Sequence, residues 1–143
     1  MKVLFDTDVV LDLLLDREPS SALAAKLLSQ VEEGAISGHL CASAVTTIQT
    51  LSAKAVGRSR ARTEVRKLLA LFEIAPVNRG VLGGALDGEF TDVDNAETHE
   101  SARQVDSRAI VTRNLRDCKH SAIPVYSPGD MLALLEAGRA EDG

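Results

Sequence analysis

The sequence predicts an α/β fold in which helices cover both faces of a central, mainly parallel sheet. Short apolar runs typical of buried strands alternate with longer segments whose apolar residues recur at helical spacing. Helical segments between successive strands imply crossover connections, and crossovers join parallel strands. The 143 residues contain no internal repeat or linker, so we expect one domain over residues 1–137 and a disordered tail over residues 138–143.

The boundaries of the elements follow from apolar runs, helix caps and helix breakers. The expected strands cover residues 3–5, 36–41, 72–77, 109–112 and 124–126. The expected helices cover residues 9–15, 22–33, 44–56, 63–71, 79–86, 95–105 and 129–137. The expected N-caps are Asp8, Ser20 or Ser21, Ser43, Asn78 and Ser127.

Breakers and charge refine three of these boundaries. Gly34 and Gly57 end the second and third helices, because glycine readily adopts the conformation that follows a helix. Pro76 lacks a backbone N–H, which places the third strand at an edge of the sheet or ends it there. The basic segment at residues 58–62 is expected as a loop before the fourth helix.

Composition limits the classes of partner. The net charge of −5 does not attract nucleic acid as a whole, so RNA binding would need a local basic patch or bridging metal ions. The two cysteines, Cys41 and Cys118, are far apart in sequence and have no zinc-ligand spacing. No apolar run approaches the roughly 20 residues of a membrane helix. We therefore expect a soluble, cytoplasmic protein with no membrane partner.

Polar side chains follow several of the predicted strands. Asp6 ends the first strand, Ser43 follows the second, and Thr112 ends the fourth. In open α/β sheets, ligands bind outside the carboxyl ends of the strands. Carboxylates from separate strand ends are typical ligands of Mg²⁺ or Mn²⁺. Such ions assist phosphodiester hydrolysis, which makes this chemistry a candidate function.

Asp8 and Asp12 are four residues apart and fall on neighbouring faces of the first helix. Two like charges this close repel unless a positive group lies between them, and a divalent metal is the usual one. The alternative is that Asp8 is only a helix cap and Asp12 only a solvated helix residue.

Four motifs together resemble a PIN domain, in particular the VapC-like toxins of type II toxin–antitoxin pairs. The motifs are Asp6-Thr7-Asp8-Val9-Val10-Leu11-Asp12-Leu13-Leu14, Ser43-Ala44-Val45-Thr46-Thr47-Ile48, Phe90-Thr91-Asp92-Val93-Asp94-Asn95-Ala96 and Ala109-Ile110-Val111-Thr112-Arg113-Asn114-Leu115-Arg116-Asp117. The resemblance extends from Val3 to about Leu134. It implies a three-layer α/β/α PIN-like fold and a Mg²⁺- or Mn²⁺-dependent ribonuclease.

The resemblance also implies which residues form the site. The family's four acids fall on Asp6, Gln49, Asn95 and Asp117, so two of them are amides here. Asp94 is the expected substitute for the third acid, which gives Asp6, Asp94 and Asp117 as the catalytic and metal-binding residues. The supporting residues are Thr7, Asp8, Ser43, Gln49, Asp92, Asn95, Thr112 and Asn114.

Binding partners are inferred in the same way. Arg113 and Arg116 flank the predicted site and are expected to contact RNA phosphates, although ion pairs with nearby acids would also explain them. The basic residues between Arg58 and Lys67 could bind phosphate or form a solvated helix face. The family resemblance implies a homodimer and a cognate antitoxin whose peptide covers the acidic site.

Two other functions remain open from the sequence. A degenerate PIN domain could bind RNA or an antitoxin without cleaving, because Gln49 and Asn95 bring no charge. Asp6-Thr7-Asp8 also fits the start of a haloacid-dehalogenase-type phosphatase, which would use Asp6 as nucleophile and Asp8 as general acid–base.

Overall fold

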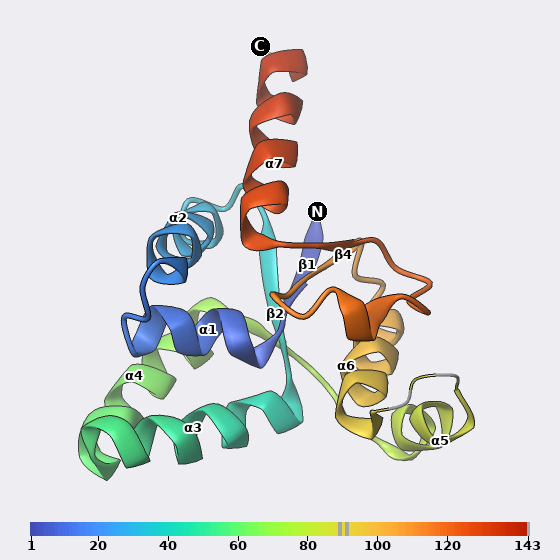
Figure 1. The fold of residues 1–143 in the computed structure, drawn as a ribbon, viewed down its shortest axis with the longest axis horizontal. Helices are drawn as coiled ribbons and strands as arrows, with labels where there is room; N and C mark the ends of the chain where they lie inside the picture. Colours follow the sequence, from blue (N-terminus) through green and yellow to red (C-terminus); the bar gives the residue numbers. More distant parts are fainter. Residues whose placement is uncertain (89, 91, 143) are drawn as a thin grey trace.

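Five parallel strands form the centre of the structure, in the order β3-β2-β1-β4-β5 (Figure 1). The structure is a computed structural model that describes residues 1–88, 90 and 92–142. The strands are β1 (Lys2–Phe5), β2 (Ser37–Cys41), β3 (Glu73–Ala75), β4 (Ala109–Val111) and β5 (Val125–Tyr126). The predicted α/β fold with a parallel sheet is confirmed.

Helices cover both faces of this sheet (Figure 1). They are α1 (Thr7–Leu14), α2 (Ser20–Glu32), α3 (Ala42–Val56), α4 (Arg58–Leu71), α5 (Arg79–Asp87), α6 (Val93–Gln104) and α7 (Pro128–Asp142), with a 3₁₀ turn, η1, at Arg116–Cys118. Within the described ranges, no helix has the length and apolar character needed to cross a membrane.

The alternation of side chains along β1 divides the core in two. Val3 and Phe5 belong to a large apolar cluster with residues of α1 to α4 and α7, whereas Leu4 belongs to a smaller one with Ala102 of α6 and Ile110 of β4. Successive residues of a strand point to opposite faces, so β1 has to be apolar on both. This explains why its sequence is a continuous apolar run rather than an alternating one.

Gly38 of β2 permits a close approach to the larger cluster. A Cβ atom at this position would lie 2.6 Å from a ring carbon of Phe72, which is too close for a real contact. Phe72 in turn packs edge-on against Phe5, with 5.2 Å between ring centroids and 76° between ring planes. The aromatic pair therefore occupies space that any other residue at position 38 would need.

Two predicted helix starts are wrong, because a residue at or directly after the end of the preceding strand already occupies the N-cap position. α1 starts at Thr7, and its N-cap is Asp6, whose carboxylate accepts the Thr7 N–H, so Asp8 lies inside the first turn. α3 starts at Ala42 after Cys41, so Ser43 is not its cap. Both helices directly follow a buried strand and begin one residue before the expected capping residues, Asp8 and Ser43.

Other boundaries shift for identifiable reasons. α2 begins at Ser20 after Pro19 and has no side-chain cap. The basic segment at residues 58–62 is helical rather than a loop, because Ala61 is buried one helical turn before Val65. The C-terminal helix continues to Asp142 instead of ending near residue 137, and Gly143 lies outside the described residues.

Three sequence signals are confirmed. The side chain of Asn78 caps α5 by accepting the Val81 N–H at 3.0 Å. The hydroxyl of Ser127 accepts the Asp130 N–H at 3.1 Å at the start of α7. The strand next to Pro76, β3, lies at an edge of the sheet.

The strand order places β1 between β2 and β4, so the chain winds in opposite directions from β1. The backbone N–H of Asp6 donates to the carbonyl of Val111 at 2.9 Å, which brings the carboxyl ends of β1 and β4 together. Ligand sites of open α/β sheets form at such a reversal.

Candidate active site

Asp6 lies at the reversal, directly after β1. One oxygen of its carboxylate accepts the backbone N–H of Thr7 at 2.8 Å, and the other accepts the hydroxyl of Thr112 at 2.8 Å. The first contact comes from α1 and the second from the end of β4. Both oxygens are thus fixed in position by elements that meet only in the folded chain.

Asp8 lies beside Asp6 and shares a partner with it. Its Oδ2 atom accepts the backbone N–H of Arg113 at 3.0 Å and lies 3.3 Å from the Thr112 hydroxyl. A hydroxyl has a single proton to donate, so Thr112 cannot fully satisfy both acids at once. The Oδ1 atom of Asp8 is buried and has no hydrogen-bond partner among residues 1–88, 90 and 92–142.

The environment of Asp8 disfavours its charge. Burial, followed by the charge of Asp6, raises its pKa from 3.8 to about 6, against the smaller opposing effects of Arg113 and Thr112. A carboxyl with this pKa is half protonated near pH 6, and a cation beside it would stabilise its charged form. The N-cap role predicted for Asp8 is wrong, because Asp6 caps α1.

A cavity of about 240 Å³ opens in front of Asp6. It is lined by Asp6, Thr7, Ser43, Ala44, Thr47, Asp94, Asn95 and Thr98. Asp92 caps α6 by accepting the N–H groups of Asp94 and Asn95 at 2.8 and 3.2 Å, so it fixes the turn that carries both residues. Side chains from α1, α3 and α6 therefore meet at one oxygen-rich cavity.

Two residues near this cavity are not among the predicted site residues. Glu97 accepts a short hydrogen bond from the hydroxyl of Ser43, whose oxygen is 3.3 Å from the Cys41 sulfur. Thr98 lines the cavity four residues after Asp94, and its hydroxyl donates to the Asp94 carbonyl at 3.0 Å. The helical spacing from Asp94 is the signal that could have identified Thr98.

Asp117 approaches the site from the loop after β4. The side-chain amide of Asn114 donates to its carboxylate at 2.7 Å, and the Asn114 backbone N–H donates to the Thr112 hydroxyl at 3.0 Å. The next residue, Cys118, is half-buried, and its pKa is raised to about 11, first by burial and then by the charges of Asp6, Asp117 and Asp8. The charges of all three acids thus act on one thiol, which is free, as is that of Cys41.

Gln49 does not join this cavity. It lines a separate groove between α3 and α4, together with Arg62 and Arg66. The α3 residue that faces Asp6 is instead Thr47. The structure brings together the predicted Asp6, Thr7, Ser43, Asp94 and Asn95, and excludes Gln49. Thr91 lies outside the described residues.

Arg113 provides the positive group that the sequence required between Asp8 and Asp12. Its backbone N–H binds Asp8, and its guanidinium pairs with Asp12 through Nε and through Nη2, the latter at 3.1 Å. The Asp12 side chain is only 2% exposed, and Arg17 adds a weaker contact at 3.9 Å. The ion-pair alternative is therefore the observed one for Arg113, and no metal is needed between these two acids.

Comparisons with known proteins identify the family. The family described as PIN domain matches residues 2–116. The chain belongs to the PIN-domain family. No curated protein matches its sequence. Since the match is to a PIN domain, Asp6-Thr7-Asp8 is not the start of a phosphatase of the haloacid-dehalogenase type.

Solved structures with a similar fold include toxin–antitoxin proteins. VapBC2 from Rickettsia felis, bound to a DNA fragment from its promoter, has a TM-score of 0.67 at 11% identity and covers 89% of this chain and 98% of the other. A toxin–antitoxin complex from Klebsiella pneumoniae has a TM-score of 0.66 at 20% identity, over 88% and 97% of the two chains. VapC20 of Mycobacterium tuberculosis, a Sarcin-Ricin loop cleaving toxin, has a TM-score of 0.65 at 11% identity, over 85% and 98%. At these identities the likeness establishes the fold of the PIN domain.

The donors in this PIN domain fit a hard divalent cation. The carboxylates of Asp6, Asp8 and Asp94 and the amide oxygen of Asn95 are all oxygen ligands, and one buried oxygen of Asp8 is unpaired within the described residues. No three His, Cys, Asp or Glu side chains in the described part of the chain are close enough to hold an ion together. Mg²⁺ usually binds through one or two carboxylates with waters and substrate phosphates, so this sparse set suits it.

We predict that Arg113→Ala destabilises the PIN domain more than Arg116→Ala does. The first change leaves Asp12 buried without its main partner, and should lower the free energy of unfolding by about 2–3 kcal/mol. Arg116 is exposed on the same loop, so its loss should change stability by less than about 0.5 kcal/mol. Urea unfolding measures both values. Equal effects of the two variants would contradict a structural role for the Arg113–Asp12 pair.

A second prediction concerns pH. Because the pKa of Asp8 is higher in the folded protein than in the unfolded chain, ionised Asp8 destabilises the fold above pH 6, and this cost disappears as the pH falls toward 3.8. Asp8→Asn should therefore stabilise the protein at pH 7 to 8 in EDTA, by at most about 3 kcal/mol. Urea unfolding between pH 4 and 8 tests this. A gain that does not decrease with falling pH, or an equal gain in the control Asp106→Asn, would contradict the prediction.

Proposed function

We propose that this PIN domain is a Mg²⁺- or Mn²⁺-dependent ribonuclease of the VapC type, which hydrolyses phosphodiester bonds in RNA. It would be the toxin of a type II toxin–antitoxin pair or a relative of such a toxin. The observation that carries the proposal is the oxygen-rich cavity where Asp6, Asp94 and Asn95 meet beside Asp8. Asp117 supports the proposal as well, because its charge, like the charges of Asp6 and Asp8, raises the pKa of the Cys118 thiol.

Each residue has a definable part in this reaction. Asp6 would be the direct carboxylate ligand of the cation, and Asp94, Asp117, Asp8 and Asn95 would complete its shell through bound water, since no three acids in the described part of the chain can ligate one ion together. A bound divalent cation supplies positive charge that stabilises the reacting phosphate and lowers the pKa of water. The Asp8 carboxyl, with its pKa near 6, is suited to accept a proton from the attacking water. Ser43, Thr47 and Thr98 line the cavity, where the RNA phosphate would lie. Their hydroxyls donate within the protein, to Glu97, to the Ser43 carbonyl and to the Asp94 carbonyl, so they shape the cavity rather than supply free protons.

A catalytically degenerate PIN domain that only binds RNA or an antitoxin is the second candidate. It is favoured by the amide at position 95 and by the lack of a three-acid cluster among the described residues. The first candidate explains more of the geometry, because binding alone would not require an unpaired, buried carboxylate oxygen at Asp8.

The proposed protein partner is a cognate antitoxin. Two of the structural neighbours are toxin–antitoxin complexes, which supports this choice. A cavity of about 610 Å³ between α1, α2, α3 and α4 offers an apolar lining that includes Leu13, Leu14, Leu28 and Leu71. Protein partners commonly cover apolar surfaces of this kind.

We also propose a homodimer in the cytoplasm. Leu82 and Leu86, one helical turn apart on α5, are 45% and 72% exposed and would be covered in a dimer. The measurement is the molar mass in solution by light scattering, with Leu86→Ser as the disrupting variant and the exposed Leu69→Ser on α4 as its control.

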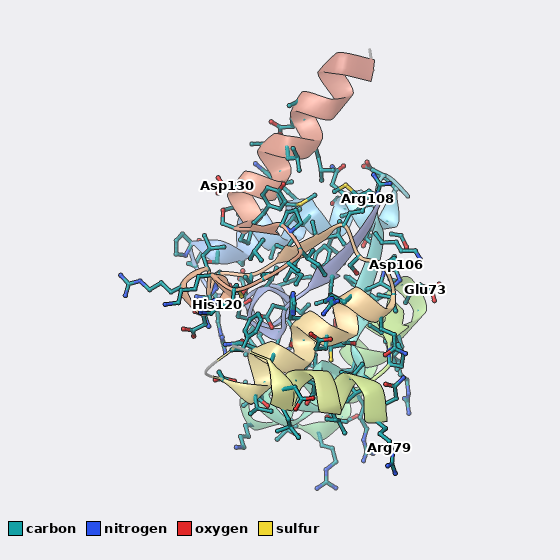
Figure 2. The ribbon with its side chains drawn as sticks, turned by 90° about the vertical axis from the view of Figure 1, so that its right-hand side faces the viewer. Glu73, Arg79, Asp106, Arg108, His120 and Asp130 are labelled. Carbon is teal, nitrogen blue, oxygen red and sulfur yellow. The ribbon has the colours of Figure 1, made fainter. Side chains whose placement is uncertain are left out.

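Asp6→Asn should abolish RNA cleavage without unfolding the protein. Asparagine is as good an N-cap as aspartate, so α1 is retained, but one charged cation ligand is lost. The measurement is cleavage of a mixed-sequence RNA with Mn²⁺, and we expect at least about a hundredfold lower rate. Asp106→Asn removes the same charge at an exposed position away from the cavity and should keep full activity (Figure 2). Wild-type protein that binds RNA but does not cleave it with Mn²⁺ would favour the degenerate PIN domain.

Asn95→Asp should raise the affinity for Mn²⁺, whereas Gln49→Glu should not. Both changes add one negative charge, but Asn95 lines the cavity with Asp6 and Gln49 lines the groove beside two arginines. Cation affinity follows the charge of the ligands, so we expect a gain on the order of tenfold for the first variant. Calorimetric titration with Mn²⁺ measures it, and an equal gain for Gln49→Glu would contradict the assignment of the cavity.

A further inference from the structure

A second concavity lies next to the active-site cavity, between α3 and α4. It has a volume of about 480 Å³. Its lining residues are Val45, Thr46, Gln49, Thr50, Arg62, Val65 and Arg66. No acid lines it, although the whole chain has a net charge of −5. The groove is therefore a local basic site on an acidic protein.

The two arginines of this groove are available to a ligand. Arg62 and Arg66 are four residues apart on α4 and thus lie on one face of the helix. Both are exposed, and the side chain of neither makes a hydrogen bond or an ion pair within residues 1–88, 90 and 92–142. Lys67 on the same helix differs, because it pairs with Glu64 at 3.3 Å.

The other donors in the groove come from α3. The hydroxyl of Thr46 is already used, since it donates to the carbonyl of Ser43 at 3.0 Å. The side chains of Gln49 and Thr50 make no such bond to the rest of the described chain, so an amide N–H and a hydroxyl remain available. Two guanidinium groups with two neutral donors and no acid form a set suited to a phosphate group.

The groove and the active-site cavity border neighbouring faces of one helix, α3. Ser43 and Thr47 of α3 line the cavity, while Thr46 and Thr50 line the groove. At 3.6 residues per turn these two pairs lie side by side around the helix. Figure 1 shows α3 leaving the end of β2 with α4 packed along it. From Ser43 to Gln49 the distance along the helix axis is about 9 Å.

We propose that the Arg62–Arg66 groove binds the phosphodiester backbone of the RNA strand beside the bond that is cleaved. This inference rests on the proposed ribonuclease function. The groove supplies charge and hydrogen-bond donors to phosphate but no aromatic side chain on which a base could stack. It therefore contributes affinity and position without selecting a sequence.

The test is RNA binding in EDTA, where cleavage does not interfere. The probe is a fluorescein-labelled, mixed-sequence single-stranded RNA, followed by anisotropy at several salt concentrations. The double variant Arg62→Ala/Arg66→Ala should bind roughly tenfold more weakly, with a salt dependence of log K shallower by about 1.4, because each lost phosphate contact releases about 0.7 fewer counterions.

The matched control is Arg79→Ala/Arg108→Ala, which removes the same charge. Figure 2 shows these two exposed arginines far apart, and the backbone N–H of Arg108 bonds to Lys2 at the amino ends of the strands. The control should bind RNA with wild-type affinity. Equal losses in both double variants, or unchanged RNA affinity with weaker binding of a polyglutamate peptide in the Arg62/Arg66 variant, would overturn the proposal.

The results test the proposed RNA-binding groove and the proposed ribonuclease activity separately. RNA affinity that depends on Arg62 and Arg66 in a protein that does not cleave with Mn²⁺ would support the groove and reject the ribonuclease. Cleavage by a protein whose RNA affinity is indifferent to both arginines would support the ribonuclease and reject the groove.

Discussion

The repulsion between Asp6 and Asp8 is the constraint on which the rest of the site depends. Both carboxylates lie at the end of β1, and burial adds to the cost of the Asp8 charge. The end of β4 supplies the compensation, through the Thr112 hydroxyl and the backbone N–H of Arg113. The pairing of β1 with β4 thus makes an otherwise unfavourable pair of acids tolerable, and leaves one oxygen of Asp8 unpaired within the described residues.

Arg113 extends this compensation into the core. Its backbone binds Asp8 while its side chain reaches Asp12, which is buried within α1. The loop that carries Asn114 and Asp117 is therefore held to α1 by an ion pair behind the site. The position of the site residues and the stability of the fold are therefore coupled through Arg113. From the sequence, Arg113 was expected to contact RNA phosphates, with an ion pair as the alternative.

Helix α3 lies between an acidic cavity and a basic groove. One face borders a cavity with Asp6 and Asp94, and the adjacent face borders a groove with Arg62 and Arg66. An acidic protein can bind an anionic polymer only if cations or local basic groups offset its own charge. The arrangement offers both, with oxygen ligands for a cation in the cavity and arginines in the groove.

The amino-acid sequence was sufficient to predict the parallel sheet, the position of β3 at an edge or its end at Pro76, the caps at Asn78 and Ser127, and the place of Asp6 after a buried strand. These are local properties, because apolar runs, proline and capping residues act within a few positions of the chain. Only the tertiary structure decided that Asp12 is buried against Arg113, that Gln49 turns away from Asp6, and that Thr47 and Thr98 face it. Each of these contacts depends on which side of a helix meets a segment distant in the sequence. The apolar pattern of the sequence does not specify that side, because the helices α1 and α3 begin earlier than their capping residues predicted.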